Sequence, residues 1–208
     1  GGKADPPQGF VDLGQAVPSL VIDLRYFGSE NFVGRPIKGY EKKRCYATKE
    51  VAEALRKVQA GLSKYQLGLK VFDAYRPQRA VDDFVTWARD RSDVKMKGSY
   101  YPNVAKKDLI PDYIAPKSGH SRGSAIDVTL VDLSRADRPA MDMGSRFDFF
   151  DSRSHSEFKE LTSQQRANRL LLRKAMEKQG FKHLAEEWWH FSLVREPYPK
   201  SYFDFPVR

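Results

Sequence analysis

Apolar residues recur every three or four positions in three stretches of the chain, which predicts three helices. The first helix is expected over about 48–62, and the second is expected directly after Pro77. The third is expected to begin at Thr162, whose spacing to Gln165 is that of a capping box, and to end before Gly180.

Segments rich in β-branched and aromatic residues lie between the predicted helices. Four of them predict strands: 20–26, 69–75, 124–133 and 188–194. Strands and helices do not alternate regularly along the chain. The pattern therefore favours α+β architecture in a single domain over residues 1–208, with a central, mainly antiparallel sheet flanked by helices.

The remaining segments are predicted to be irregular. Residues 95–118 and 134–160 form two long connections, and loops of this length in a compact chain are commonly functional. Residues 1–17 are expected to be loosely ordered. The tail 196–208 contains three prolines and is expected to lie along the surface.

The composition is that of an ordinary globular protein. Of the 208 residues, 40% are hydrophobic, and no apolar run approaches the ~20 residues that a membrane span needs. We therefore expect no membrane span. The chain starts at Gly1 without Met, which indicates a processed or engineered terminus and leaves a periplasmic and a cytoplasmic location open.

The net charge of +9 is compatible with an anionic partner such as nucleic acid, lipid or cell-wall polymer. The basic residues do not form long blocks and no nucleic-acid-binding motif is present, so we expect no nucleic-acid partner. The oligomeric state stays open. Cys45 is the single cysteine, so no intrachain disulfide can form, and a metal site must use histidines and carboxylates.

His120 and Asp127 are the first pair of residues suited to chemistry. His120 lies in a polar loop, and Asp127 lies seven positions later inside a predicted strand. Gly123 between them allows a sharp turn of the backbone. A carboxylate in a strand of apolar residues needs a partner, which is either a metal ion or a set of local backbone donors.

Glu187 and His190 are the second pair. On a regular strand their side chains would point to opposite faces, so a joint role requires a turn or a bulge at the intervening tryptophans, Trp188 and Trp189. We expect the two tryptophans to form a dry wall, which would raise the pKa of Glu187. The alternative is an aromatic core patch with a salt bridge at its rim. The zincin pattern H-E-x-x-H is absent.

Taken together, the two pairs resemble the signature of the M15 zinc peptidases, which cleave D-Ala-containing peptides of the bacterial cell wall. The matching pattern is Ser118-x-His120-x-x-Gly123-x-Ala125-x-Asp127, followed by Glu187-x-Trp189-His190. The chain is most similar to the VanX-type D-Ala-D-Ala dipeptidases, from about Ile22 to Arg208. Further matching segments are Tyr26 with 31–34, 73–77, 99–103, 143–148 and 196–206.

The resemblance implies one zinc ion per chain and a hydrolytic reaction that splits D-Ala-D-Ala into two D-Ala. It implies that the zinc ligands are His120, Asp127 and His190. It also implies that Glu187 is the general base and acid for zinc-bound water, and that Arg76 stabilises the oxyanion.

The resemblance further implies a small pocket for the D,D-dipeptide, lined by Tyr26, Ser118 and Asp148. Asp148 would bind the substrate ammonium, and Ser118 would help to bind its carboxylate. Gly119 departs from the pattern, because the similar dipeptidases carry serine there, and this puts one hydrogen bond to the substrate in doubt.

Two alternatives remain at this stage. The first is a D,D-carboxypeptidase on the same scaffold, which would trim D-Ala from longer peptidoglycan stems. The second is a non-catalytic module that binds the cell wall. The physiological role, whether glycopeptide resistance, wall recycling or use of D-Ala as a nutrient, stays open.

Overall fold

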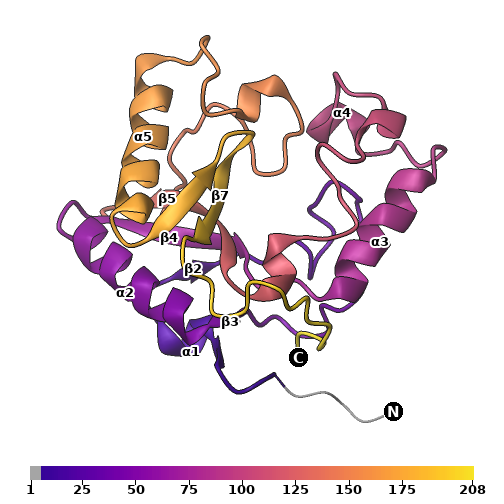
Figure 1. The fold of residues 1–208 in the computed structure, drawn as a ribbon. Coiled ribbons are helices and arrows are strands. Elements are labelled where there is room, and N and C mark those ends of the chain that lie inside the picture. Colours follow the sequence, from indigo (N-terminus) through magenta and orange to yellow (C-terminus); the bar gives the residue numbers. More distant parts are fainter. Residues whose placement is uncertain (1–5) are drawn as a thin grey trace.

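A five-stranded sheet forms the centre of the protein, seen in a computed structural model that describes residues 6–208 (Figure 1). The strands are β2 (Val21–Ile22), β4 (Leu67–Asp73), β5 (Ala125–Asp132), β6 (Phe181–Leu184) and β7 (Glu187–Leu193). Their order in the sheet is β2-β4-β5-β7-β6. The pair β2–β4 is parallel and the other neighbours are antiparallel. This mixed, mainly antiparallel sheet confirms the predicted α+β class.

Three long helices form where the apolar periodicity predicted them. They are α2 (Lys49–Ser63), α3 (Gln78–Arg89) and α5 (Ser163–Glu177). The Oγ1 atom of Thr48 accepts a hydrogen bond from the amide of Val51 at 3.3 Å and caps α2. Thr162 and Gln165 form both bonds of the predicted capping box. Gly180 follows α5 with a φ of +91°, a backbone conformation that glycine adopts without strain.

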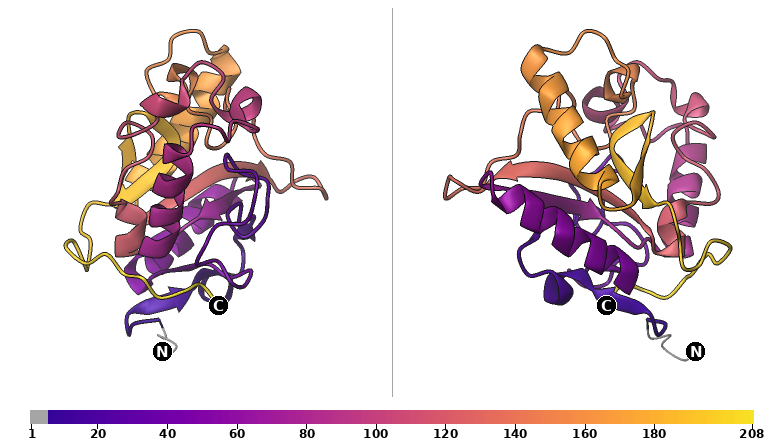
Figure 2. Two further views of the ribbon diagram at one scale, coloured as in Figure 1. Left: turned by 90° about the vertical axis from the view of Figure 1, so that its right-hand side faces the viewer. Right: turned by 60° about the vertical axis from the view of Figure 1, so that its left-hand side comes forward.

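The helices lie on two sides of the sheet. In Figure 1, α2 and α5 lie to its left and α3 lies to its right. The helices α2 and α5 contact one another, and both contact strands of the sheet. The right-hand view in Figure 2 shows α3 apart from this helix pair.

The N-terminal segment is more ordered than expected. Within it, β1 (Phe10–Asp12) pairs antiparallel with β3 (Tyr46–Thr48), and the short helix α1 (Leu13–Ala16) follows. Phe10 and Leu13 are buried in the core. The expectation of loose order over 1–17 is therefore wrong for 10–17, and residues 1–5 lie outside the described part of the chain.

The end of the C-terminal tail packs into the core. The ring of Phe205 stacks on Tyr75 with 4.0 Å between ring centroids and an interplanar angle of 11°. Val207 is buried and forms a bridge with Tyr40. The expected surface course holds for 199–202, which are exposed, and is wrong for 205–207, where apolar side chains find partners in the core.

The loops contain short helices that the pattern did not predict. They are α4 (Lys97–Tyr100) and the 3-10 turns η1 (Lys106–Asp108), η2 (Gly119–Arg122) and η3 (Ser152–Ser154). The strand expected over 20–26 is reduced to β2, and β6 was not predicted at all. No helix among residues 6–208 is both long enough and apolar enough to cross a membrane.

Candidate active site

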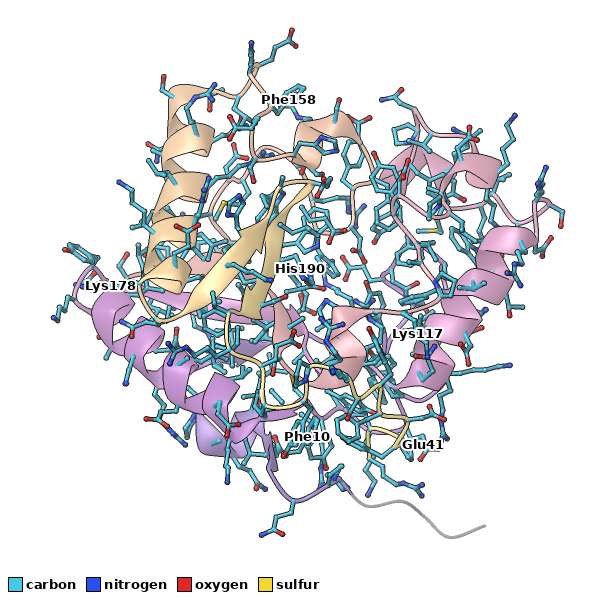
Figure 3. The ribbon with its side chains drawn as sticks, in the orientation of Figure 1. Phe10, Glu41, Lys117, Phe158, Lys178 and His190 are labelled. Atoms are coloured by element: carbon cyan, nitrogen blue, oxygen red, sulfur yellow. The ribbon has the colours of Figure 1, made fainter. Side chains whose placement is uncertain are left out.

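The predicted metal ligands meet at the centre of the sheet. His120 lies on η2, Asp127 on β5 and His190 on β7, where Figure 3 labels it. One potential ligand atom from each residue lies within 4.8 Å of the other two. Asp127 and His190 are direct partners across the antiparallel pair β5–β7, so the strand register itself brings two of the three together.

The turn that carries His120 has a clear local cause. The Oγ atom of Ser118 accepts a hydrogen bond from the amide of His120 at 3.2 Å and so caps η2. Gly123 ends the turn with a φ of +88°. A Cβ atom at Gly123 would lie 2.5 Å from the ring of Phe10, so both the backbone angle and the packing require glycine.

Each imidazole is held by a hydrogen bond on the side away from Asp127. The Nδ1 atom of His120 lies 2.7 Å from the backbone carbonyl of Ala74, and its Nε2 atom lies 3.2 Å from Oδ1 of Asp127. His190 is turned the other way: Nδ1 lies 3.2 Å from the same oxygen, and Nε2 lies 3.2 Å from Oγ of Ser192. This arrangement is typical of histidines that bind metals, because the outer hydrogen bond fixes the ring and its tautomer.

The donor set fits a zinc ion. Two imidazole nitrogens and one carboxylate are common zinc ligands, and three protein ligands leave a position for water or substrate. Burial would raise the pKa of Asp127, but the imidazoles of His120 and His190 outweigh it and lower that pKa far below its usual value. The carboxylate is therefore ionised and ready to bind a cation.

The bulge expected between Glu187 and His190 is present in β7. Against β6, Leu184 pairs with Glu187 and the adjacent His183 pairs with Phe191, so three residues of β7 bulge out between these two pairs. The bulge turns Glu187 and His190 toward the same side. The carboxylate of Glu187 lies 3.9 Å from Nδ1 of His190.

In the metal-free protein, the environment of Glu187 disfavours the ionised form of its carboxyl group. Burial, together with the negative charges of Asp127 and Asp148, raises the pKa of Glu187 to about 8, although His190 acts in the opposite direction. Its side chain keeps 18% of its surface exposed, so it can still reach solvent. Only Trp189 of the predicted tryptophan wall lines the same cavity; Trp188 points away and donates to Oγ of Ser145.

Arg76 reaches the same space from the end of β4. Its Nε atom lies 3.0 Å from the buried carboxylate of Asp73. Its terminal nitrogens lie 3.7 Å from Asp127 Oδ2 and 3.5 Å from Ser118 Oγ. The ring of Tyr26 faces the guanidinium at 5.2 Å. Burial disfavours a charged guanidinium, but Asp73 and its neighbours outweigh this and raise the pKa of Arg76 further, so it stays cationic.

Asp148 is a second buried carboxylate in the site. It is only 4% exposed, and the hydroxyl of Tyr26 donates a short hydrogen bond to it. Burial, with the charge of Asp127, raises the pKa of Asp148 to about 8. Its φ is +61°, which is uncommon for a residue other than glycine and is found mainly where function or packing imposes it.

A single cavity of about 500 Å³ joins all of these side chains. The eight residues that the sequence analysis singled out all line it: Tyr26, Arg76, Ser118, His120, Asp127, Asp148, Glu187 and His190. The segment 111–115, which the sequence pattern assigned only to a long loop, also lines the cavity. Asp73 and Ser192, which support Arg76 and His190, were not predicted as site residues, since nothing in their spacing distinguishes them from structural residues.

Comparison with known proteins shows to which family the chain belongs. The profile of peptidase family M15, described as D-Ala-D-Ala dipeptidase, matches residues 7–208. The chain belongs to this family. The resemblance inferred from the sequence motifs is thereby confirmed, as is the assignment to the zinc peptidases.

Curated family members cover nearly the whole chain. A D-alanyl-D-alanine dipeptidase of Enterococcus faecium is 44% identical over 201 residues, which are 96% of this chain and 98% of the relative. A dipeptidase of the same name from Streptomyces coelicolor is 39% identical over 95% of this chain and 96% of the relative. A third, from Escherichia coli, is 35% identical over 88% of this chain and 83% of the relative.

Among solved structures, the chain is similar to a mutant of the vancomycin resistance D,D-pentapeptidase VanY in complex with Zn(II). The TM-score is 0.43 and the sequence identity is 13%, over 76% of this chain and 78% of that one.

Proposed function

We propose that this family member hydrolyses the dipeptide D-Ala-D-Ala to two molecules of D-Ala with the help of one zinc ion. The observation that carries the proposal is the single cavity, which brings three zinc-ligand side chains, a carboxylate, a guanidinium and a second buried carboxylate together. The curated relatives that cover almost the whole chain are named for the same activity.

His120, Asp127 and His190 would hold the metal. When bound, zinc supplies Lewis-acid activation of water and of the scissile carbonyl. Glu187 is placed to accept the proton of the attacking water and to deliver it to the leaving amine. Burial raises the pKa of Glu187 in the metal-free protein, and a zinc cation held by the neighbouring ligands would lower it again, so that the carboxylate is available to accept the proton.

Arg76 is the donor for the oxyanion in this proposal. Its guanidinium faces the same cavity as Asp127 and is permanently charged. Asp73 fixes one edge of the guanidinium, which leaves the terminal nitrogens directed toward the substrate. Preorganised donors of this kind stabilise the charge that develops in the transition state, since they need no reorientation during the reaction.

Asp148 and Ser118 would bind the two ends of the dipeptide. The carboxylate of Asp148 would meet the substrate ammonium, with the hydroxyl of Tyr26 holding it in place. Ser118 would help to bind the substrate carboxylate beside Arg76. A buried carboxylate facing the cavity favours a substrate with a free ammonium group over a longer peptide stem, which has an amide at that position.

The proposal is tested by a comparison of substrates with the zinc-loaded protein. We expect release of D-Ala from D-Ala-D-Ala, no release after removal of zinc by a chelator, and recovery when zinc is restored. Little release is expected from N-acetyl-D-Ala-D-Ala or from a pentapeptide muropeptide. A preference for the muropeptide would support the D,D-carboxypeptidase instead, and absence of hydrolysis of all three would support a binding module.

A further inference from the structure

Arg169 of α5 is a buried cation with an unusual set of partners. Its side chain lies in the interior, and the residue is 8% exposed. Its three nitrogens donate to backbone carbonyls: Nε to Met143 at 2.6 Å, Nη2 to Arg153 at 2.7 Å and Nη1 to His155 at 2.9 Å. Two of its charged neighbours, Arg153 and Arg166, are themselves cations, and within residues 6–208 the carboxylate of Asp142 is the one negative charge that acts on it.

These three bonds close a loop. Met143 lies at one end of the segment 143–155, and Arg153 and His155 lie at the other, so one guanidinium holds both ends. Further bonds tie the ends to each other: Nε of Arg153 donates to the carbonyl of Gly144 at 2.6 Å, and the hydroxyls of Ser145 and Ser154 lie 2.9 Å apart. The planar guanidinium suits this task, because its donors have fixed directions.

The loop packs tightly against α5 and the segment that precedes it. Gly144 has a φ of +87°, and a Cβ atom there would lie 2.6 Å from Leu161 and 3.4 Å from Nη2 of Arg169. The base of the loop therefore has little freedom to shift while the three carbonyl bonds are intact.

Asp148 lies at the middle of this loop. Its left-handed backbone conformation costs free energy, so the surrounding structure must impose it. The neighbouring ring of Phe147 stacks on Phe72 with 4.5 Å between centroids and meets Trp189 edge-on at 5.5 Å. The ring contacts hold the tip of the loop, while Arg169 holds its base.

We infer that Arg169 is a positioning residue for substrate binding: by closing the loop 143–155, it holds Asp148 where it can meet the substrate ammonium. This inference rests on the proposed function, in which Asp148 binds that ammonium. Arg169 itself does not line the cavity, so its effect must pass through the loop. A displacement of about 1 Å at a binding group is enough to lower activity strongly.

The test uses steady-state kinetics of the zinc-loaded Arg169→Gln variant with D-Ala-D-Ala. We expect KM to rise about tenfold, with kcat changed by less than about threefold and with zinc content unchanged. Arg166→Gln is the matched control, because Arg166 lies one turn earlier on α5, is exposed and donates only to the carbonyl of Lys159. Its KM should equal that of the unaltered protein.

A double-mutant cycle distinguishes an effect of Arg169 on the position of Asp148 from a general disruption of the folded structure. In a protein that already carries Asp148→Asn, adding Arg169→Gln should change kcat/KM by less than about twofold, because the group that Arg169 positions has lost its charge. A full tenfold effect in that background would overturn the inference. So would an unchanged KM for folded Arg169→Gln in the otherwise unaltered protein.

Hydrogen exchange gives a readout that does not depend on activity. In Arg169→Gln, amides of 143–155 should exchange at least about tenfold faster, while those of α2 and β5 keep their rates. Unchanged exchange in 143–155 would overturn the inference even if the unaltered protein proved inactive on D-Ala-D-Ala, an outcome that would reject the proposed function alone. If Arg169→Gln does not fold, Arg169→Lys is used instead. Lysine keeps the charge but lacks the planar guanidinium with its three bonded nitrogens, so KM and the exchange rates should change in the same directions by smaller factors.

Discussion

Asp127 and His190 are 63 positions apart in the chain, yet they are direct partners across β5 and β7, with 3.2 Å between Oδ1 and Nδ1. Asp73 is the partner of Asp127 on the other side, across β4 and β5. A single row across three strands therefore supplies two metal ligands and the residue that anchors Arg76. The geometry of the site is in large part the geometry of the sheet.

His190→Ala should abolish stable zinc binding. The loss of one of three ligands should lower zinc affinity by more than about 100-fold, since even the loss of a hydrogen bond that supports a ligand costs 10–100-fold. Zinc content after dialysis against a weak chelator measures the effect. His183→Ala is the matched control, because that histidine pairs with Glu177 at the surface and should leave zinc content unchanged. Retention of one zinc per chain by His190→Ala would remove this residue from the ligand set.

Arg76→Lys should lower kcat for D-Ala-D-Ala by about 10²–10³-fold, the usual cost of losing one oxyanion donor, with zinc content preserved. A lysine keeps the positive charge near Asp73 but cannot bond to it and to the substrate in the same geometry. The control is Arg79→Lys, which affects an exposed ion pair with Asp204. A normal kcat in Arg76→Lys would contradict the role assigned to the guanidinium.

Asp148 should make the metal-free protein less stable as the pH rises. The pKa of Asp148 is about 8 in the folded chain and about 3.9 in an unfolded chain. The folded state therefore binds more protons between these values, and the free energy of unfolding should fall as the pH rises from about 4 to about 8. Urea unfolding at several pH values measures this slope. Asp148→Asn should show a smaller decline, and parallel profiles for the two proteins would contradict the burial argument.

Phe205→Ala should lower the free energy of unfolding by about 3–5 kcal/mol, as expected for removal of a buried aromatic ring. The ring stacks on Tyr75 and meets Phe10 and Tyr46 edge-on. Tyr202→Ala, a change at a side chain that is 36% exposed in the same tail, should cost less than about 1 kcal/mol. If urea unfolding shows the same loss of unfolding free energy for both variants, the ring of Phe205 contributes little to the core.

The helices could be predicted because their signals are local. The cap at Thr48, the capping box at Thr162 and the apolar periodicity act within a few residues of one another. The strand β2 could not be predicted in its true length, because the point where its regular pairing with β4 ends is set by a partner strand distant in the sequence. The same holds for the end of the tail, where Phe205 is buried by partners distant in the sequence.

The site could be predicted through its motif, and the supporting residues could not. The spacing of Glu187 and His190 required a bulge, and the pairing of β6 with β7 contains it. Arg169 has no such signal, because an arginine on a polar helix is normally solvated. Its burial depends on carbonyl groups that a loop with no regular pattern presents to it.

The most direct test of the account is the hydrolysis of D-Ala-D-Ala by the Glu187→Ala variant, with zinc content measured on the same sample. We predict that zinc stays bound and that kcat falls by about 10³-fold or more, in line with the loss of a general base. Glu160→Ala, a change at an exposed glutamate that does not line the cavity, should keep normal turnover. Normal hydrolysis by zinc-loaded Glu187→Ala would contradict the central claim that this carboxylate drives the reaction.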